Sequence, residues 1–504
     1  MPAWLRPCER VDEAALQRGL RMLVYDGLCS QVMSVLVGGA FLVQFALMLG
    51  ASNTVIGLIA AVGPLAQILQ IPAIYLVDGS RQRKAMTVIP AGLGRLFLLL
   101  VAGLPWLAPP AWRVPLLLGG LFMYFGLGAV AGCAWNSWIR DLVPQPIMGA
   151  YFAKRLSVAT AVGAVASLGA GVAVDRFRGL GGSPELVYSV VFGVGLAFGL
   201  VGLVFLVRTP EPRMAPSQTK GLLAVLAEPF RDENFRRLLL FLGSWNFAIN
   251  LAAPFFTVYL LKTLGLSMTW VIGLSVLSQI VNVMFFRLWG RLSDRFANKP
   301  VLGLSGFLFI VSILIWPFTT LPRAHLLSIP LVILIHILAG MATAGVAISG
   351  GNIALKLAPY GHATSYLAVN GLVCGLAASV APILAGIGAD WLKNQQLRIS
   401  ISWISGARQF DGPAFKLQGL DFLFVVAGIL GLLSLQLLLS VREVGEVEED
   451  LLVGHLVAEM RQKIKSVSTI AGLRNLSFFP YHRLKDMLQH IPPARRRGQG
   501  GANG

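Results

Sequence analysis

The sequence predicts an all-α membrane protein with twelve transmembrane helices in two pseudosymmetric six-helix bundles. The first observation behind this prediction is the composition, since 56% of the residues are hydrophobic and only 13% are charged, with a mean hydropathy of +0.72. A soluble domain of this size needs far more polar surface. The second is a series of apolar stretches near the length of about twenty residues that a bilayer-spanning helix requires.

The third observation is an internal repeat. Residues of the first half recur in the same order in the second half, where predicted helices begin or end. Gly171 and Asp175, for example, recur as Gly386 and Asp390. Further pairs are Pro144 with Pro359, Tyr151 with Tyr366, Ser52 with Ser267, Thr54 with Thr269, Gly57 with Gly273 and Asn136 with Asn352. A duplicated, strongly apolar chain predicts two similar bundles with a binding site between them.

The first bundle is predicted at residues 21–208, after a polar and basic cytoplasmic segment at residues 1–20 that does not resemble a cleaved signal peptide. Each predicted span is a continuous apolar run, unlike the alternating pattern of a β-barrel strand. The six predicted spans of this bundle are Leu28–Leu49, Thr54–Val77, Ala85–Leu107, Val114–Trp138, Leu156–Val174 and Leu186–Val207.

A cytoplasmic linker with one short surface helix is predicted at residues 209–237, where prolines and charges interrupt the apolar pattern. The second bundle is predicted at residues 238–441, and a charged cytoplasmic tail at residues 442–504. The six spans of the second bundle are Leu238–Leu261, Trp270–Leu288, Val301–Leu321, Leu326–Gly350, Ser365–Ala389 and Phe422–Val441.

The net charge of +18 is explained by the way the predicted helices cross the membrane. Lys and Arg are more frequent in the loops on the side of both termini, and such loops face the cytoplasm. We therefore expect a multi-pass protein of a bacterial-type cytoplasmic (inner) membrane with both termini in the cytoplasm. Because the charges are dispersed over short loops, no nucleic-acid partner is expected. The basic run at residues 495–497 suits a tail that contacts anionic lipid.

The sequence offers no catalytic chemistry. Cys8, Cys29, Cys133 and Cys374 form no CxxC pair and predict neither a disulfide framework nor a zinc site. No Walker loop, HExxH motif or serine nucleophile elbow occurs. We therefore expect a protein that is not an enzyme and has no catalytic residue, cofactor or metal.

The loop after predicted span 8 carries the most specific motif. It reads Gly290-Arg291-Leu292-Ser293-Asp294-Arg295-Phe296-Ala297-Asn298-Lys299 and resembles the signature loop of the major facilitator superfamily (MFS), G-x-L-x-D-R-x-G-R-[RK]. The loop after predicted span 2 keeps Asp78, Arg83 and Lys84 but departs from the pattern at Ile74 and Gly79. The resemblance covers residues 21–441 and implies the MFS fold, with a central cavity that opens to either side of the membrane in turn.

The resemblance implies that these two loops form a gate, which latches the cytoplasmic side when the protein opens outward. An acid at a helix end can accept hydrogen bonds from the N-terminus of a neighbouring helix, where the dipole favours negative charge. We therefore expect Asp294 and Asp78 to act as latches, and the small Gly290 to permit close helix approach. Flanking basic residues would bridge to the acids; they are Arg83, Arg295 and Lys299. In the simpler interpretation these charges only mark the cytoplasmic face.

A second repeated block surrounds Pro144, between predicted spans 4 and 5. Arg140 and Asp141 precede it and Arg155 follows it, so the three could form an ion-pair network between helices at the cytoplasmic face. We expect a structural and gating role for Asp141 and Arg155 rather than substrate contact. The simpler interpretation is that one helix ends before the proline and the next begins after it.

Polar residues inside the predicted spans are the candidates for a solute site, because polar groups are unfavourable in lipid and face a cavity or a partner helix. The resemblance implies that spans 1, 4, 7 and 10 line the central cavity. Interhelical hydrogen bonding is the alternative role for amides. The substrate-binding candidates on these spans are Gln31, Gln44, Asn136, Asn246, Asn250, His336 and Asn352.

Two charged residues have open roles. Arg95 lies about 15 Å into predicted span 3, near the middle of the bilayer, and no acid is expected at its depth. It serves either the structure or an anionic ligand. Asp26 lies at the mouth of predicted span 1 and is the only acid near the interior of any predicted span. Ion coupling would therefore run through His336, Asp26 or Asp141, or not occur.

The sequence thus predicts a monomeric secondary transporter or facilitator, which moves a small solute by alternating access, with H+ or Na+ as candidate coupling ions. The alternative is a non-transporting assembly or pigment-delivery factor on the same fold, since a fold does not determine a function. Amide-rich cavity candidates suit a neutral polar or amphipathic solute.

Overall fold

A computed structural model describes residues 7–8, 12–144, 147–214, 222–320, 325–359, 363–405 and 408–443. The described residues all belong to one compact unit. The predicted tail beyond residue 443 and most of the first eleven residues lie outside the described residues.

The first half of the described chain is helical throughout. Its helices are α1 (Glu13–Val37), α2 (Gly39–Met48), α3 (Asn53–Ala66), α4 (Gln70–Ser80), α5 (Arg83–Leu107), α6 (Pro110–Leu142), α7 (Met148–Gly179) and α8 (Pro184–Val207). Gly39 has a φ of +51° at the junction between α1 and α2, a left-handed conformation that glycine adopts without strain. The two helices together form one candidate membrane span, Glu13–Met48.

The second half begins with the short helix α9 (Leu222–Arg231), which lies in the predicted linker. It continues with α10 (Glu233–Val258), α11 (Met268–Phe296), α12 (Asn298–Ile315), α13 (Ser328–Leu357), α14 (Ala363–Leu392) and α15 (Leu420–Leu439). Among the described residues, 12 helices are long and apolar enough to cross a membrane. The prediction of an all-α protein with twelve transmembrane helices is therefore confirmed.

Helix α1 begins well before its predicted span. The sequence analysis places the start at Leu28, but α1 begins at Glu13, and the carboxylate of Asp12 caps it by accepting a hydrogen bond of 2.8 Å from the Ala15 amide. An apolar run locates only the membrane-embedded part of a helix, whereas capping groups set its true end. Asp26 consequently lies inside the helix rather than at its mouth.

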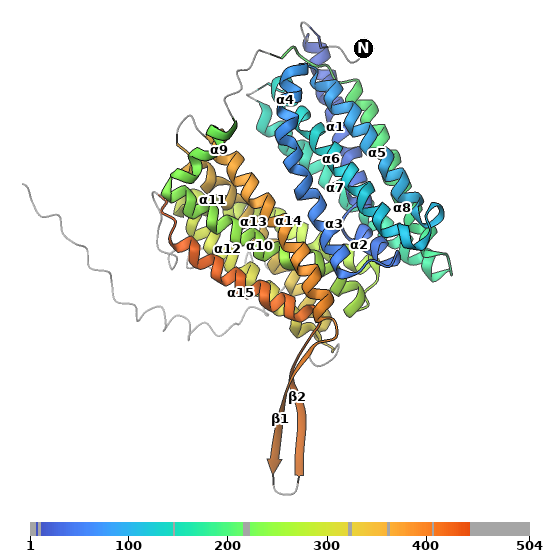
Figure 1. Ribbon diagram of the computed structural model, residues 1–504, viewed down its shortest axis with the longest axis vertical. Coiled ribbons are helices and arrows are strands. Elements are labelled where there is room, and N and C mark those ends of the chain that lie inside the picture. The colour runs from blue at the N-terminus through green and yellow to red at the C-terminus, as the bar shows by residue number, and fades with distance from the viewer. Residues whose placement is uncertain are drawn as a thin grey trace, which may run out of the picture. The chain divides into compact units, whose positions relative to one another are not determined.

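The long loop between the last two spans folds into a hairpin that the sequence analysis does not predict. Strands β1 (Gln396–Ser405) and β2 (Arg408–Gln418) pair in antiparallel register, with an irregularity between Ile399 and Ser400. Figure 1 shows this hairpin projecting from the ends of α14 and α15. This long loop is therefore a regular element over most of its length.

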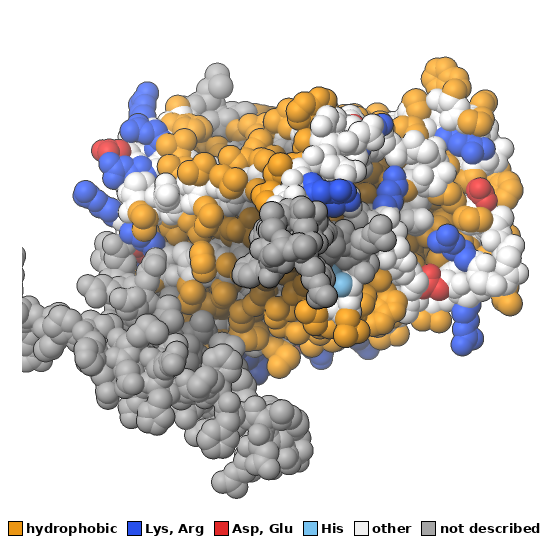
Figure 2. All heavy atoms as spheres, turned by 90° about the horizontal axis from the view of Figure 1, so that it is seen from below, with side chains coloured by type: hydrophobic (Ala, Val, Ile, Leu, Met, Phe, Trp, Pro, Cys, Tyr) orange, Lys and Arg blue, Asp and Glu red, His pale blue; other side chains and the backbone are white. Residues whose placement is uncertain are grey.

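Large apolar side chains lie on both the inside and the outside of the helices. Phe45, Phe241 and Trp289 are buried, while Leu99, Val165 and Met284 are exposed. Figure 2 shows that hydrophobic side chains occupy much of one face. The exposed apolar side chains along the helices suit lipid rather than water as the surrounding solvent.

The helices of the two halves contact each other chiefly through α3 with α14 and through α7 with α11, and Figure 1 shows α3 beside α14. Glycines permit these approaches. A Cβ at Gly57 would lie 2.0 Å from the carbonyl oxygen of Pro382, and one at Gly386 would lie 2.8 Å from the Cα of Thr54.

The two ends of the molecule are named for what they carry. The end at which α3 and α11 start and α7 and α14 finish is called the latched end, after the contacts described below. The opposite end, which carries Arg83 and Asp294, is the basic end.

Candidate functional site

Asp390, near the end of α14 in the second half, binds the first turn of α3 in the first half. Its carboxylate accepts hydrogen bonds from the backbone amides of Asn53 at 3.0 Å and Thr54 at 2.8 Å, and from the Thr54 hydroxyl at 2.7 Å. The first amides of a helix have no partner within it, and the helix dipole favours a negative charge there. The carboxylate therefore joins the two halves by charge-assisted bonds.

Asp175, near the end of α7, makes the reciprocal contact. It accepts hydrogen bonds from the backbone amides of Met268 at 3.1 Å and Thr269 at 2.7 Å, at the start of α11 in the second half. Each half thus supplies one acid and receives the other half's acid at a helix N-terminus. We call these two contacts the Asp175 latch and the Asp390 latch.

At the basic end, Arg83 ties the first half to the start of the linker. Its side chain is buried and bonds the Asp141 carboxylate, the Ser137 carbonyl at 3.1 Å and the Pro212 carbonyl at 2.7 Å. Its backbone amide donates to Glu211 at 2.8 Å. Both Arg83 and Asp141 are therefore engaged within one half and do not join the halves.

Glu443 occupies the matching position in the second half. It accepts hydrogen bonds from the Asn298 side chain at 2.8 Å, the Lys299 backbone amide at 2.7 Å and the Lys356 ammonium at 2.9 Å. Burial raises the pKa of this carboxyl, but these donors outweigh burial and hold the pKa below its ordinary value. At Glu211 burial prevails over the bonds from the Arg83 and Lys84 amides, and the pKa is raised.

The signature loop of the second half is open in this conformation. Asp294 and Arg295 are exposed, no described residue bonds or pairs with the Asp294 carboxylate, and the Arg295 guanidinium lies 5.2 Å from the Phe296 ring centroid. A Cβ at Gly290 would meet no atom within 4 Å, so the expected close helix approach is absent there. Asp78 lies in α4, and its side chain is outside the described residues.

Arg155 of α7 pairs with Asp26 of α1 and not with Asp141, so the expected Asp141–Arg155 network divides into two separate clusters. Arg155 Nη2 lies 3.6 Å from Asp26 Oδ2, and Arg155 Nε donates to the Leu23 carbonyl at 3.0 Å. The Arg155 guanidinium also lies 5.2 Å from the Trp135 ring centroid. These bonds join α1, α6 and α7 within the first half.

Arg95 belongs to the same buried region. Only 6% of Arg95 and 5% of Asp26 are exposed, and the two charges interact. The expectation that Arg95 has no acid at its depth is therefore wrong, because α1 reaches further than its apolar run and carries Asp26 inside. The Nη1 of Arg95 has no hydrogen-bond partner among the described residues.

The amide candidates are dispersed. Asn246 and Asn250 donate to the carbonyls of Leu242 and Asn246 on their own helix, both at 2.8 Å. Asn136 and Asn352 are exposed, in α6 and α13. Gln31 of α1 packs against Gly163 of α7, since a Cβ added at Gly163 would lie 2.9 Å from the Gln31 Cγ. Gln44 lines a cavity of about 530 Å³ with Asp175 at the latched end.

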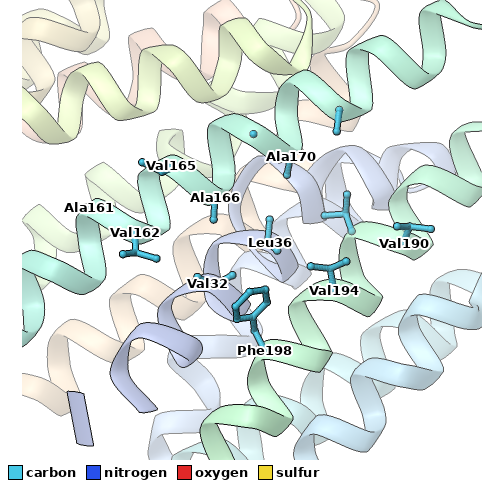
Figure 3. A pocket seen from close by; sticks show the side chains of 13 residues that line it. Val32, Leu36, Ala161, Val162, Val165, Ala166, Ala170, Val190, Val194 and Phe198 are labelled. Atoms are coloured by element: carbon cyan, nitrogen blue, oxygen red, sulfur yellow. The ribbon is translucent and has the colours of Figure 1, made fainter. Parts of the chain in front are cut away.

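Two other cavities differ in character. One of about 680 Å³ between α1, α7 and α8 is lined only by glycine and apolar side chains such as Val165, Val194 and Phe198 (Figure 3). It offers no side-chain hydrogen bond, so it does not suit a polar solute. The other, of about 500 Å³, is lined by His336 and lies among α10, α11, α12 and α13.

Sequence reasoning did not assign a role to the acids that bond helix N-termini here. Asp175, Asp390, Glu211 and Glu443 were candidates for neither binding nor gating. A signal was present for the first two, because the Gly171–Asp175 repeat accompanies the repeated Ser52 and Thr54 at helix starts. The pairing crosses between the halves, and a repeat within one chain does not reveal which helix start meets which acid.

Comparisons agree with this architecture. The sequence matches the Major Facilitator Superfamily over residues 27–382, and no curated protein matches it. The structure of the nucleoside transporter NupG is 14% identical with a TM-score of 0.58, covering 84% of this chain and 98% of that chain. For the POT family transporter PepTSo the identity is 12%, the TM-score 0.62 and the coverages 84% and 97%.

The xylose transporter XylE from E. coli, in an inward open conformation, is 15% identical with a TM-score of 0.59, covering 85% of this chain and 96% of that chain. Identities this low show the fold alone. The family match extends over most of the chain and gives no support to a non-transporting assembly factor or an enzyme. With its twelve membrane-spanning helices, this protein belongs to the Major Facilitator Superfamily and is a multi-pass membrane transporter of small solutes.

Proposed function

We propose that this transporter works by alternating access, and that the conformation described here is closed at the latched end and open at the basic end. The observation that carries the proposal is the pair of reciprocal latches. Among the described residues, the hydrogen bonds between the two halves all lie at the latched end, through Asp175 and Asp390. Asp294 at the other end has no partner there.

The basic residues support an orientation with both termini in the cytoplasm of the inner membrane. The latched end then faces outward, and the solute pathway opens to the cytoplasm. In the alternative state we assign the closing contact to Asp78 and Asp294, which lie at the ends of α4 and α11. One chain supplies both halves and both latches, so we propose a monomer as the transporting unit.

The strength of the latches suits a reversible gate. A hydrogen bond to a charged group contributes about 1.5–3 kcal/mol to stability. When the latch opens, hydrogen bonds to water and new contacts recover part of this free energy. Several such bonds can bias the two states by a few kcal/mol without locking either one. Removing both negative charges should therefore shift the populations measurably and leave the bundles folded.

Spin-label distance measurements on the Asp175→Asn, Asp390→Asn double variant test this proposal. In a background in which the native cysteines are serine, one label pair at Leu180 and Trp391 reports on the latched end, and another at Ser80 and Leu355 on the basic end. We expect the double variant to lengthen the first distance and shorten the second. The variant Glu185→Gln removes an acid near the same end that bonds neither helix start, and should change neither distance.

The two distances must respond in opposite directions. Unchanged distance distributions in the double variant, or lengthening at both ends together, would show that the two contacts do not hold an alternating gate.

A further inference from the structure

The cavity lined by His336 has the size of a solute site. Its volume is about 500 Å³, and its walls come from α10, α11, α12 and α13 of the second half and from Trp316, in the turn directly after α12. Binding sites for small molecules have volumes of about 300–1,000 Å³, with apolar walls and a few converging polar groups. Gln279 and Thr343 in its lining are exposed, so the cavity is accessible.

One wall of the cavity is aromatic. The ring of Phe256 stacks on that of Trp316, with centroids 4.9 Å apart and an angle of 9° between the planes. The His336 ring meets Trp316 edge-on at 5.9 Å. Trp316 is only 2% exposed, so the neighbouring side chains hold this wall rigidly. Flat rings pack favourably against such a surface, in offset or edge-to-face geometry.

His336 also contributes a hydrogen-bonding group. Its Nδ1 lies 2.8 Å from the Val332 carbonyl oxygen. Because a carbonyl only accepts, Nδ1 carries the proton, and in the neutral ring Nε2 is left as an acceptor. The aromatic wall therefore carries one acceptor at its edge.

The polar part of the lining comes mainly from α11. Ser275, Gln279 and Asn282 are four and three residues apart, so they share one face of the helix. The Asn282 side-chain amide donates to the Thr343 hydroxyl at 2.9 Å, which leaves the Asn282 carbonyl oxygen as an acceptor. No described residue bonds the Gln279 amide. This part of the lining can thus both donate and accept hydrogen bonds.

The lining contains no Lys, Arg, Asp or Glu among the described residues. An ion brought into such a cavity loses its hydration without gaining a partner of opposite charge, which is strongly unfavourable. A neutral solute loses much less. The cavity therefore discriminates by charge as well as by shape.

We infer that this cavity binds an uncharged, ring-bearing solute whose flat face packs against Phe256, which Trp316 supports from behind, and whose amide or hydroxyl edge meets Gln279 and Asn282. The inference rests on the proposed function, since it makes this cavity the solute site of the transporter. It narrows the substrate class to neutral aromatic or heteroaromatic compounds with hydrogen-bonding groups along one edge.

Equilibrium binding to the purified full chain in detergent tests the inference without any need for transport. The probes are two pairs that differ in charge: uridine with uridine monophosphate, and para-hydroxybenzamide with para-hydroxybenzoate. Glycerol serves as a polar probe without a ring. We expect the neutral member of at least one pair to bind and raise the melting temperature, and its anionic partner and glycerol to do neither.

Variants locate the binding. Asn282→Ala and Gln279→Ala should each weaken binding of the neutral probe by about ten-fold, the effect of losing one well-formed hydrogen bond. Gln436→Ala, on α15 beside a different cavity, is the matched control and should leave the affinity unchanged. All three changes are at partly or fully exposed side chains, and the melting temperature without ligand checks that each variant folds.

Absence of binding by both neutral probes at millimolar concentration, equal binding of the anions, or full affinity in both α11 variants would overturn the assignment. The distance measurements on the latch variants are made without ligand. They can therefore fail while binding succeeds, or succeed while binding fails, and the two proposals are tested separately.

Discussion

At the scale of single residues, the position of a carboxylate relative to a helix N-terminus decides what it does. Asp175 and Asp390 bond helix starts in the opposite half, so they can act on the arrangement of the halves. Glu211 and Glu443 bond the starts of α5 and α12 in their own half. The same interaction therefore serves the proposed gate at one end of the molecule and joins elements of a single bundle at the other.

The pH dependence of stability tests the role of Glu443. Folding lowers its pKa below the ordinary value of 4.5, so the charged form stabilises the fold above that pH, and the contribution is lost as the pH falls through the folded-state pKa. We expect Glu443→Gln to lower the melting temperature at neutral pH, and the difference from the unmodified protein to shrink below pH 4.5. Glu13→Gln, at an exposed acid, is the control; a difference that stays constant with pH would contradict this role.

At the scale of helices, the repeat produces unequal contacts. Gly57 in α3 and Gly273 in α11 are counterparts in the repeat, yet their surroundings differ. A Cβ at Gly57 would lie 2.0 Å from the Pro382 carbonyl oxygen, whereas one at Gly273 would meet no atom within 4 Å. The α3–α14 contact therefore depends on a missing side chain, and the α7–α11 contact does not depend on Gly273.

Alanine at these two positions is expected to act differently. Gly57→Ala should force α3 and α14 apart, with an overpacking penalty of about 1–3 kcal/mol in this conformation, and so favour the state that is open at the latched end. Gly273→Ala should leave the populations unchanged. The label pair at Leu180 and Trp391 measures the outcome, and equal responses of the two variants would show that close packing at Gly57 does not control the state.

At the scale of the whole molecule, the hydrogen bonds between the two halves lie at one end of the described structure, and the proposed orientation puts that end outside the cell. Because both halves begin on the same side of the membrane, their corresponding loops must also lie on one side. The accessibility of one residue at each end therefore tests the entire topology.

Labelling of intact cells with a membrane-impermeant maleimide supplies this test. In a background without native cysteines, Leu180→Cys, at a position that is 87% exposed near the latched end, should react in intact cells. Ser80→Cys at the basic end should react only after the membrane is permeabilised. The opposite pattern would invert the proposed orientation, and labelling of both in intact cells would contradict the predicted topology.

Most of the fold could be predicted from the sequence, but little of the site. The spans follow from apolar runs, because lipid imposes the same length and polarity on every helix that crosses it. The ends of the helices do not follow from such runs, and the error at α1 concealed Asp26 within the bundle. The partners of Arg83 and Arg155 were also unpredictable, since each bonds a residue far away in the chain.

The sequence by itself determined that the molecule is a duplicated chain of membrane-spanning helices, and its loop around Asp294 resembles the signature of a transporter family. The apolar runs and the repeat are properties of local composition and spacing, because the bilayer imposes the same length and polarity on each spanning helix separately. Only the tertiary structure decided that Asp175 and Asp390 are the acids engaged between the halves, and that Phe256, Trp316 and Gln279 face one cavity. Those relations depend on how helices distant in sequence pack together, and the packing follows from the shape and charge of all of them at once.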